Sequence, residues 1–458
     1  MYVLCAKALV AGDGYSYLGE PFTVRPPGMS LLIAPWIAAR GVDFHSLNLL
    51  IASFGVAAAA LFFALLRPRT GAVVAFAASL ALFLNPGFRR MSNEVMSDVP
   101  GLALTFACLL LDRRARRTPS WRNEVLLGAA IGLSAYIRSI LVLLVPAILA
   151  ARALATLRER AGPRWLAFAR RSALPLVAVP VLLLLPWNLR SQAHAPEPPV
   201  DQTFIYDYST GMWHTDPGDP SSPRLGPEAV LARVPLRARQ VLSLLGSRMA
   251  SSDAGALELA AGGIAAALAL ALAAVRRRSS DVYLAVVAGV VVVYFGFQDR
   301  LVLPIYSLAL AAIAELAARS GARLGGGRGR AAAAAAISAL VLADFRWRPR
   351  WDEIEDTDSF YRRLGVELAS RIEPDARVAT AVGWHLSLYA DRPVWSLTFA
   401  ARRAGRTSGV EPVIDKYGID TVVLTEATEA ERTLLPWFQA HYPSVRVGPA
   451  QVFRVRGG

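Results

Sequence analysis

Long apolar runs alternate with short polar connections over the first 344 residues of the chain. A membrane-spanning helix needs about 20 mostly apolar residues, and shorter helices are tolerated inside a bundle. The pattern therefore predicts a polytopic α-helical membrane domain, residues 1–344, with about ten transmembrane helices. The apolar segments lie near 45–66, 70–87, 97–111, 124–137, 139–152, 172–189, 255–275, 282–298, 300–318 and 331–344. Arg138 and Ser139 can mark either a turn between two helices or a kink within one.

The opening segment, residues 1–44, departs from this pattern. Gly12, Gly14 and the run Pro26–Gly28 interrupt it, and it is too polar to cross a bilayer. We interpret it as a loop that ends in a short helix from about Met29, lying against the membrane. The two prolines prepare an extended chain, so Arg25 is expected at a stiff corner.

The pattern changes again after residue 345, where alternating and helical spacings replace the long apolar runs. The stretch 347–372 has the spacing of a charged helix, RVATAVGWHLSLYA and IDTVVLTE read as strands, and VEPVIDKYG reads as a helix between them. The end of the chain, VRVGPAQVFRV, predicts a hairpin. Residues 345–458 are therefore expected to form a small α/β domain without a phosphate loop or dinucleotide motif.

Composition and charge support a membrane protein and give it a topology. The chain is 54% hydrophobic and 18% charged, with a mean hydropathy of +0.39 and a net charge of +14. Its arginines cluster on every second connection, which is typical of cytoplasmic loops rather than of nucleic-acid binding. The clusters are Arg67 with Arg69, residues 113–117, the arginines between 152 and 171, residues 276–278, and the arginines between 319 and 330.

The alternate connections are then outside. They include the opening loop, residues 88–98, the long segment 190–254 and the C-terminal domain, in a bacterial cytoplasmic membrane. This topology leaves the opening loop outside with no helix before it. Either the N-terminus is exported unaided or a first helix precedes Met1, and we favour the second.

Three acids are candidates for catalysis. In SNEVMSDVPG, Glu94 and Asp98 stand four residues apart, which would place them on one face of the helix that begins there. They can cap that helix, or they can orient an acceptor hydroxyl, act as a general base or hold a divalent cation. Asp13, between two glycines, is either a turn residue or a third catalytic acid.

Four arginines stand at expected outer helix mouths or in the opening loop: Arg25, Arg138, Arg190 and Arg300. Each can be an interfacial residue that keeps its charge in water. Converging on one face, they would bind the phosphate of an anionic lipid.

Other chemistries find little support. The five histidines are scattered, and the two cysteines cannot form a metal cluster, so no metal site is assigned. No nucleophile elbow is present, which argues against a serine hydrolase.

Several of these segments, taken in order, resemble one family. The motifs are Y-x-x-x-A-x-x-L from Tyr2, G-x-G-Y from Gly12, R-P-P-G from Arg25, N-E-x-x-x-D from Asn93, I-R-S from Ile137, P-W-N-x-R from Pro186 and D-R-x-x-x-P-I-Y from Asp299. Together they resemble the bacterial GT-C glycosyltransferases, relatives of protein O-mannosyltransferases and of the lipid A aminoarabinose transferase.

The resemblance implies an enzyme that moves a sugar from a polyprenyl-phosphate donor to an envelope glycan, lipid or protein acceptor at the outer face of the membrane. It also implies a general base just before the Tyr2 motif, which here would precede Met1. A truncated, non-catalytic family member is therefore one alternative. A transporter or lipid flippase is the other, although few polar residues lie in the middles of the apolar segments.

Overall fold

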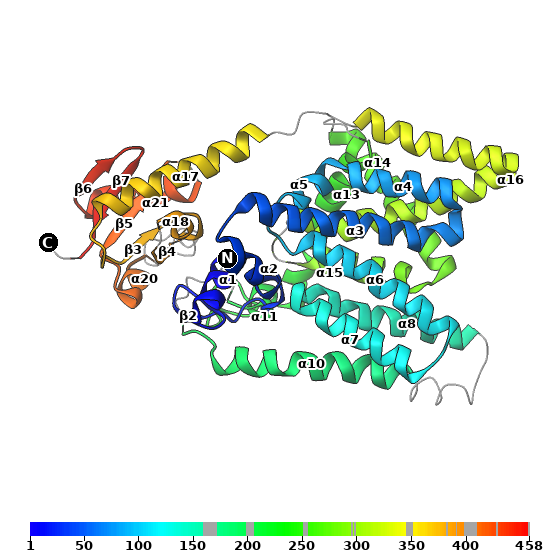
Figure 1. The fold of residues 1–458 in the computed structure, drawn as a ribbon, viewed down its shortest axis with the longest axis horizontal. Coiled ribbons are helices and arrows are strands. Elements are labelled where there is room, and N and C mark those ends of the chain that lie inside the picture. Colours follow the sequence, from blue (N-terminus) through cyan, green and yellow to red (C-terminus); the bar gives the residue numbers. More distant parts are fainter. Residues whose placement is uncertain are drawn as a thin grey trace. The chain divides into compact units, whose positions relative to one another are not determined.

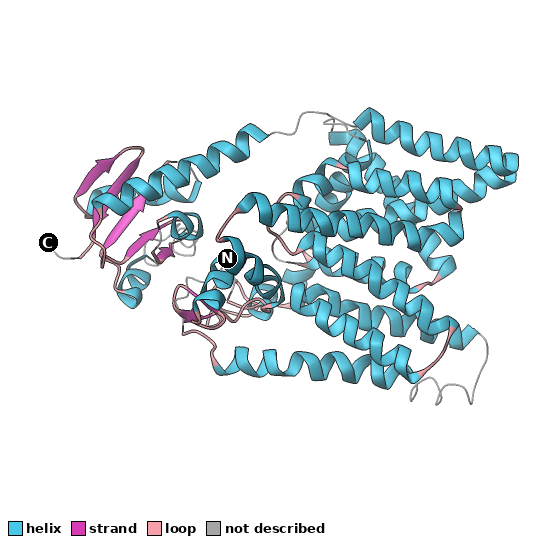
Figure 2. Cartoon of the chain, viewed as in Figure 1, coloured by secondary structure: helices cyan, strands magenta, loops and turns pink. Residues whose placement is uncertain are grey.

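The computed structural model describes residues 1–158, 172–197, 206–250, 255–294, 296, 299–344, 351–381, 383–390, 392–397, 410–426 and 429–456. Figures 1 and 2 show a mostly helical chain with a small sheet near its C-terminus. Its contacts group into two compact units. One unit is built from residues 25–190 and 227–347, and the other from residues 1–24, 191–226 and 348–458. Four arginines of the predicted cytoplasmic connections, at 160, 164, 170 and 171, lie outside the described residues.

The first unit is a bundle of helices, which we call the helical unit. Its helices are α2 (Gly28–Arg40), α3 (Phe44–Thr70), α4 (Ala72–Leu84), α5 (Pro86–Ser92), α6 (Asp98–Arg117), α7 (Trp121–Ile137), α8 (Leu144–Arg158), α10 (Leu174–Ala193), α12 (Pro227–Leu231), α13 (Val234–Ala250), α14 (Gly255–Arg276), α15 (Ser279–Val293) and α16 (Leu303–Asp344). Two short 3-10 helices, η1 (Ser139–Leu143) and η3 (Asp299–Val302), precede α8 and α16.

Local sequence signals account for the ends of these helices. Asp43 caps α3 by accepting hydrogen bonds from the amides of His45 and Ser46, at 3.1 and 3.2 Å. The helix ends at Gly71 with Arg67 and Arg69 in its last turn, where cations interact favourably with the helix dipole. In α16 the backbone leaves helical geometry at Gly325 and Gly326, within the predicted glycine-rich linker.

All ten predicted apolar segments fall on these helices, with the last two sharing α16. Among the described residues, five helices are long and apolar enough to cross a membrane, or six if the bent pair α4 and α5 is one span. The other segments are short, like α15, or carry acids and arginines, like α6. The chain is an integral membrane protein with several spans. One helix, α13, was not predicted, because it lies inside the segment interpreted as a long exported loop.

The second unit, which we call the α/β unit, begins with a helix where the sequence predicts a loop. Residues Tyr2–Ala11 form α1, and Gly12 ends it in a left-handed conformation (φ 90°) with its amide bonded to carbonyls of the last turn. That part of the prediction is wrong because the breakers start only at Gly12, and the ten residues before it are apolar except for Lys7 and contain no glycine or proline. Two-residue strands β1 (Ser16–Tyr17) and β2 (Glu20–Pro21) follow as a hairpin.

The rest of the α/β unit is a sheet with helices. After α11 (Tyr208–Trp213) and α17 (Trp351–Arg371), the strands β3 (Val378–Thr380), β4 (Val394–Ser396), β5 (Thr421–Leu424), β6 (Ser444–Val447) and β7 (Ala450–Arg454) form one sheet in the order β4-β3-β5-β7-β6. β3 pairs in parallel with β4 and β5, whereas β7 is antiparallel to β5 and β6. The small α/β domain and its terminal hairpin are confirmed.

Two details of this domain differ from the prediction. The stretch RVATAVGWHLSLYA is only partly a strand, because α18 (Gly383–Tyr389) follows β3. Leu386 and Ala390 are both buried and stand four residues apart, which is helical spacing. The helix α20 (Val410–Tyr417) lies where expected, whereas α21 (Glu429–His441) and β4 were missed.

Candidate functional site

Two of the candidate residues, Asp98 and Arg138, lie at one end of the helix pair α6 and α7. Asp98 is the first residue of α6 and Arg138 directly follows the last residue of α7. A short connection, residues 118–120, joins the two helices at their other end. The start of α6 therefore meets the end of α7, and we call this end of the bundle the Asp98 end.

Asp98 is a buried carboxylate held by arginine. Its residue is 2% exposed, and Oδ1 accepts a hydrogen bond from Nη1 of Arg138. Arg300, in η3, brings its own Nη1 to 3.9 Å from Oδ2 of Asp98. The structure therefore brings together one predicted acid and two of the predicted phosphate-binding arginines.

Gly101 makes room for this pair. A Cβ atom at Gly101 would lie 2.9 Å from Cδ of Arg138, closer than side-chain atoms normally approach. The glycine one turn after Asp98 thus lets the Arg138 side chain lie along α6. The break after α7 is a true helix end, because Arg138 is extended (φ −151°) before η1 begins.

Glu94 takes part in the same region, though not on the face of α6. The sequence prediction is wrong here, because Glu94 lies in the connection between α5 and α6. Its Oε1 is 3.4 Å from Nε of Arg90, and Nη2 of that arginine donates to Asp299 at 2.8 Å. Burial raises the pKa of Glu94 above its ordinary value, and the charge of Arg90 opposes this shift.

Sequence reasoning missed Arg248, on α13, because its segment was assigned to an exported loop. The residue is 8% exposed, and Nη2 donates to the carbonyl of Asp299 at 3.3 Å. Its Nε and Nη1 are buried and have no hydrogen-bond partner among the described residues. Gly87 leaves space for the guanidinium, since a Cβ there would lie 2.7 Å from Nη1. The only sequence signal for Arg248 is an arginine near the end of a segment whose apolar residues have helical spacing.

The R-P-P-G corner lies against the end of α7. A Cβ at Gly28 would lie 2.5 Å from the carbonyl carbon of Tyr136, so only glycine allows this approach. Arg25, half-buried, stands three residues before Gly28, and Tyr136 stands two residues before Arg138. The corner is therefore packed beside the helix end that carries Arg138.

The remaining two candidates, Arg190 and Asp13, lie on other elements. Arg190 lies on α10, with its guanidinium carbon 5.6 Å from the centre of the Trp187 ring. Asp13 is exposed in the turn that follows α1 in the α/β unit. Their roles stay predictions.

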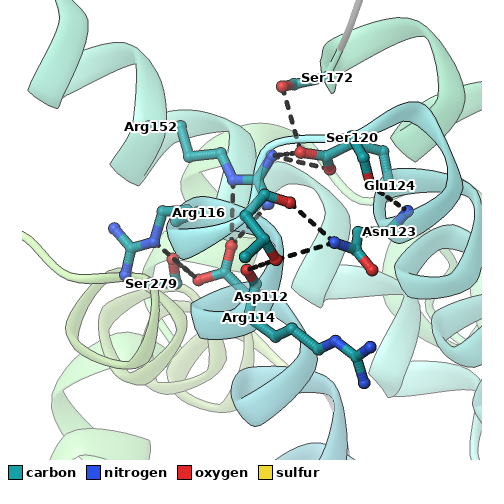
Figure 3. A network of polar contacts seen from close by, with 10 residues as sticks. Asp112, Arg114, Arg116, Ser120, Asn123, Glu124, Arg152, Ser172 and Ser279 are labelled. Carbon is teal, nitrogen blue, oxygen red and sulfur yellow. Dashed lines mark hydrogen bonds and ion pairs between the residues drawn. The ribbon is translucent and has the colours of Figure 1, made fainter.

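The opposite end of α6 holds a second buried network, drawn in Figure 3. Nε and Nη2 of Arg152 donate to Asp112 at 3.0 and 2.8 Å, and Nη1 donates to both carboxylate oxygens of Glu124 at 2.8 Å. Ser279 donates to the other oxygen of Asp112 at 2.8 Å. Each of the three guanidinium nitrogen atoms of Arg152 thus donates a hydrogen bond. We call this end the Asp112 end.

The Asp98 end differs in its balance of charges and therefore in what it can bind. It combines Asp98, Glu94 and Asp299 with four arginines, at positions 90, 138, 248 and 300, and two nitrogen atoms of Arg248 lack an acceptor among the described residues. Such an arrangement can bind an anion such as a phosphate while a carboxylate approaches a hydroxyl. No group of three or more His, Cys, Asp or Glu side chains that could hold a metal occurs within the described part of the chain.

The chain is similar to a known protein family and to solved structures. Residues 24–186 match the family model of dolichyl-phosphate-mannose-protein mannosyltransferase. The fold is similar to that of ArnT from Cupriavidus metallidurans bound to undecaprenyl phosphate, with a TM-score of 0.64 and 15% identity over 99% of this chain and 92% of that chain. For apo ArnT from the same organism the TM-score is 0.62, at the same identity and coverage. No curated protein matches the chain.

These findings confirm the resemblance to GT-C glycosyltransferases. The matched segment contains Arg25, Glu94, Asp98 and Arg138, and the fold over nearly the whole chain is similar to that of ArnT.

Proposed function

We propose, given this GT-C fold, that the chain is a membrane glycosyltransferase that takes its sugar from a polyprenyl-phosphate donor and passes it to an acceptor at the outer face of the cytoplasmic membrane. The observation that carries the proposal is the Asp98 end, where arginines outnumber acids around one buried carboxylate. ArnT, whose fold is similar, has been crystallised with undecaprenyl phosphate. In this topology the C-terminal domain is also outside.

The arginines suit the leaving group of this reaction. The acceptor oxygen attacks the anomeric carbon, the bond from that carbon to the phosphate oxygen breaks, and polyprenyl phosphate leaves with the additional negative charge. Guanidinium groups are forked donors that bind phosphate well, and fixed cations stabilise charge as it develops. Arg248 suits this role because its Nε and Nη1 have no hydrogen-bond partner among the described residues. Arg300 suits it because it lies 3.9 Å from the carboxylate that already accepts from Arg138. Arg25 and Arg190 are further candidates for the same phosphate.

The acids divide into two roles. Asp98 is buried between arginines, which suits a group that positions Arg138 and Arg300 rather than one that takes a proton. Glu94 is half-buried with a raised pKa, so it is the better acceptor for the proton that leaves the acceptor hydroxyl. Asp13, exposed in the opening segment, is a third candidate for that proton. A divalent cation remains an optional partner of these acids.

The test measures sugar transfer by the full chain in phospholipid nanodiscs. Polyprenyl phosphates carrying different sugars are supplied with membrane-derived acceptors, and release of free polyprenyl phosphate is followed. We expect turnover with at least one donor, and a loss of about 10²-fold in Asp98→Asn, because Arg138 and Arg300 lose the carboxylate that positions them. Glu228→Gln, at an exposed position on α12, is the matched control and should keep full activity.

A second variant protects the test against misfolding. Arg300→Ala removes a more loosely held partner of Asp98, so we expect it to lose activity while it keeps the thermal unfolding midpoint of the parent chain. Full activity in both variants would contradict the assigned site. Movement of the intact donor across the bilayer without transfer would instead support a transporter.

A further inference from the structure

A separate cluster of charges surrounds Glu315, in α16, and serves neither of the two ends described above. We call it the Glu315 cluster; it consists of Glu315, Asp281, Arg69, Arg276, Arg278 and Arg319. Glu315 is 2% exposed and accepts from Arg278 at 2.8 Å, Arg276 at 2.9 Å and Arg69 at 3.1 Å. Arg319 lies 3.7 Å from the same carboxylate.

The cluster carries more positive than negative charge. Among the described residues, the acids that contact its four arginines are Glu315 and Asp281, and Asp281 accepts from Nη2 of Arg276 at 3.0 Å. Nε of Arg276 is buried without a hydrogen-bond partner among the described residues. The guanidinium of Arg330 comes close as well, 4.0 Å from the position of a Cβ on Gly71. Because two carboxylates cannot satisfy this many guanidinium groups, the cluster is suited to an additional anion.

Part of this charge is accessible. The side chains of Arg69, Arg278 and Arg319 are 20%, 25% and 49% exposed, whereas that of Arg276 is 6% exposed. The three partly exposed arginines can donate to a ligand at the surface. The buried Arg276 holds Glu315 and Asp281 in place.

Exposed apolar side chains lie on α14 and α16, which carry cluster residues, and on α4, which packs beside them. α4 packs against both α3 and α16, and these helices lie side by side in Figure 1. Val73 and Phe76, in the first turns of α4, are exposed, as are Val275 beside Arg276 and Leu324 on α16. In a membrane protein such side chains face acyl chains, so an anion bound at Arg69 or Arg278 would lie next to lipid.

We propose that the Glu315 cluster binds the phosphodiester headgroup of an anionic phospholipid, with the acyl chains against the exposed side chains of α4 and α14. The basic connections predict this end of the helices to be cytoplasmic, where a negative leaflet supplies such lipids. A soluble phosphate ion has the same charge chemistry but gains nothing from the apolar border. The site is separate from sugar transfer and does not depend on the proposed function.

The experiment measures thermal unfolding of the full chain in detergent after lipid removal. Phosphatidylglycerol, phosphatidylcholine or inorganic phosphate is titrated, and the concentration that gives half of the maximal stabilisation is recorded. We expect phosphatidylglycerol to raise the unfolding midpoint, and the other two to have little effect.

Two matched double variants locate the site. In Arg69→Gln with Arg278→Gln, the half-maximal concentration of phosphatidylglycerol should rise about tenfold or more, since each arginine near a lipid headgroup contributes about fivefold. Arg67→Gln with Arg277→Gln removes the same charge from exposed positions on the same connections and should shift it much less. If the first variant folds poorly, Arg319→Gln, at the most exposed cluster arginine, should still give about a fivefold shift.

Several results would overturn the proposal. Equal stabilisation by phosphatidylglycerol and phosphatidylcholine would show that charge plays no part. Equal stabilisation by inorganic phosphate would show an anion site without lipid specificity. Equal shifts in the two double variants would show that the arginines act only through the total charge of that face.

Discussion

The two ends of α6 present the same kind of ion pair in opposite conditions. Asp98 and Asp112 are 2% and 1% exposed, and each is hydrogen-bonded to an arginine that follows it by 40 residues. At Asp112 a second carboxylate and a serine complete the network. At Asp98 the surplus lies with the arginines, and Arg248 keeps two buried nitrogen atoms without an acceptor among the described residues.

This difference separates a structural network from a site. Buried charges cost free energy unless each is paired and hydrogen-bonded, so a complete network holds helices together. An incomplete one persists where a ligand supplies the missing acceptor. The imbalance, rather than the presence of charge, identifies the Asp98 end as the place for an anionic substrate.

Breaking the complete network should have the largest effect on stability. Asp112→Ala leaves Arg152 with one carboxylate, so the free energy of unfolding should fall by about 3–5 kcal/mol. Thermal unfolding in nanodiscs checks this, with Arg116→Gln as control. Arg116 lies 3.4 Å from Asp112 and its side chain is 37% exposed, so its loss should cost less than about 1 kcal/mol. Similar losses in both variants would contradict the contrast.

Removing the incompletely paired arginine should act in the opposite direction. Arg248→Met replaces a buried cation that lacks hydrogen-bond acceptors with an apolar side chain. In the absence of the polyprenyl-phosphate sugar, the free energy of unfolding should therefore rise by about 1–3 kcal/mol. Sugar transfer should fall at the same time, because the phosphate loses a donor. Unfolding midpoints measured with and without polyprenyl phosphate separate the two effects. A destabilised variant with full activity would assign Arg248 a structural role only.

Glu94 should give a smaller effect that depends on pH. Its native pKa is raised, so the native chain binds the proton more tightly than the unfolded chain does. Its contribution to stability therefore declines as pH rises from the ordinary value of 4.5 through the raised pKa, and the cost is complete above it. Glu94→Gln removes this dependence. The midpoint of the variant relative to the parent should rise with pH by the equivalent of about 1 kcal/mol or less; a constant difference would contradict the buried setting of Glu94.

Much of the fold could be predicted from the sequence because it depends on long, regular signals. The ten apolar segments became helices, and the terminal hairpin and α20 lie where alternation and helical spacing placed them. Short elements were less predictable: α1 and α18 were missed because ten or fewer residues fit a loop or a strand equally well until buried positions such as Leu386 and Ala390 are known.

The candidate site was predictable only in part. Asp98, Arg138 and Arg300 stand out as charges at the edges of apolar runs, and the structure brings them together. Arg248 could not be found this way, because its importance comes from packing against Gly87 and Asp299, far away in the sequence. The placement of Glu94 outside α6 depends on where the helix begins, which the spacing of four residues alone does not determine.

The most direct test of the account is the affinity of the full chain for polyprenyl phosphate, the product of the proposed transfer. It is measured by titration in nanodiscs that contain phosphatidylglycerol, so that other anionic lipid sites are already occupied. The account predicts binding about 10–100-fold weaker in Arg300→Gln, the loss of a charged hydrogen bond, and unchanged binding in Arg116→Gln at the other end of α6. Unchanged affinity in Arg300→Gln, or equal loss in both variants, would contradict the assignment of the Asp98 end as the donor site.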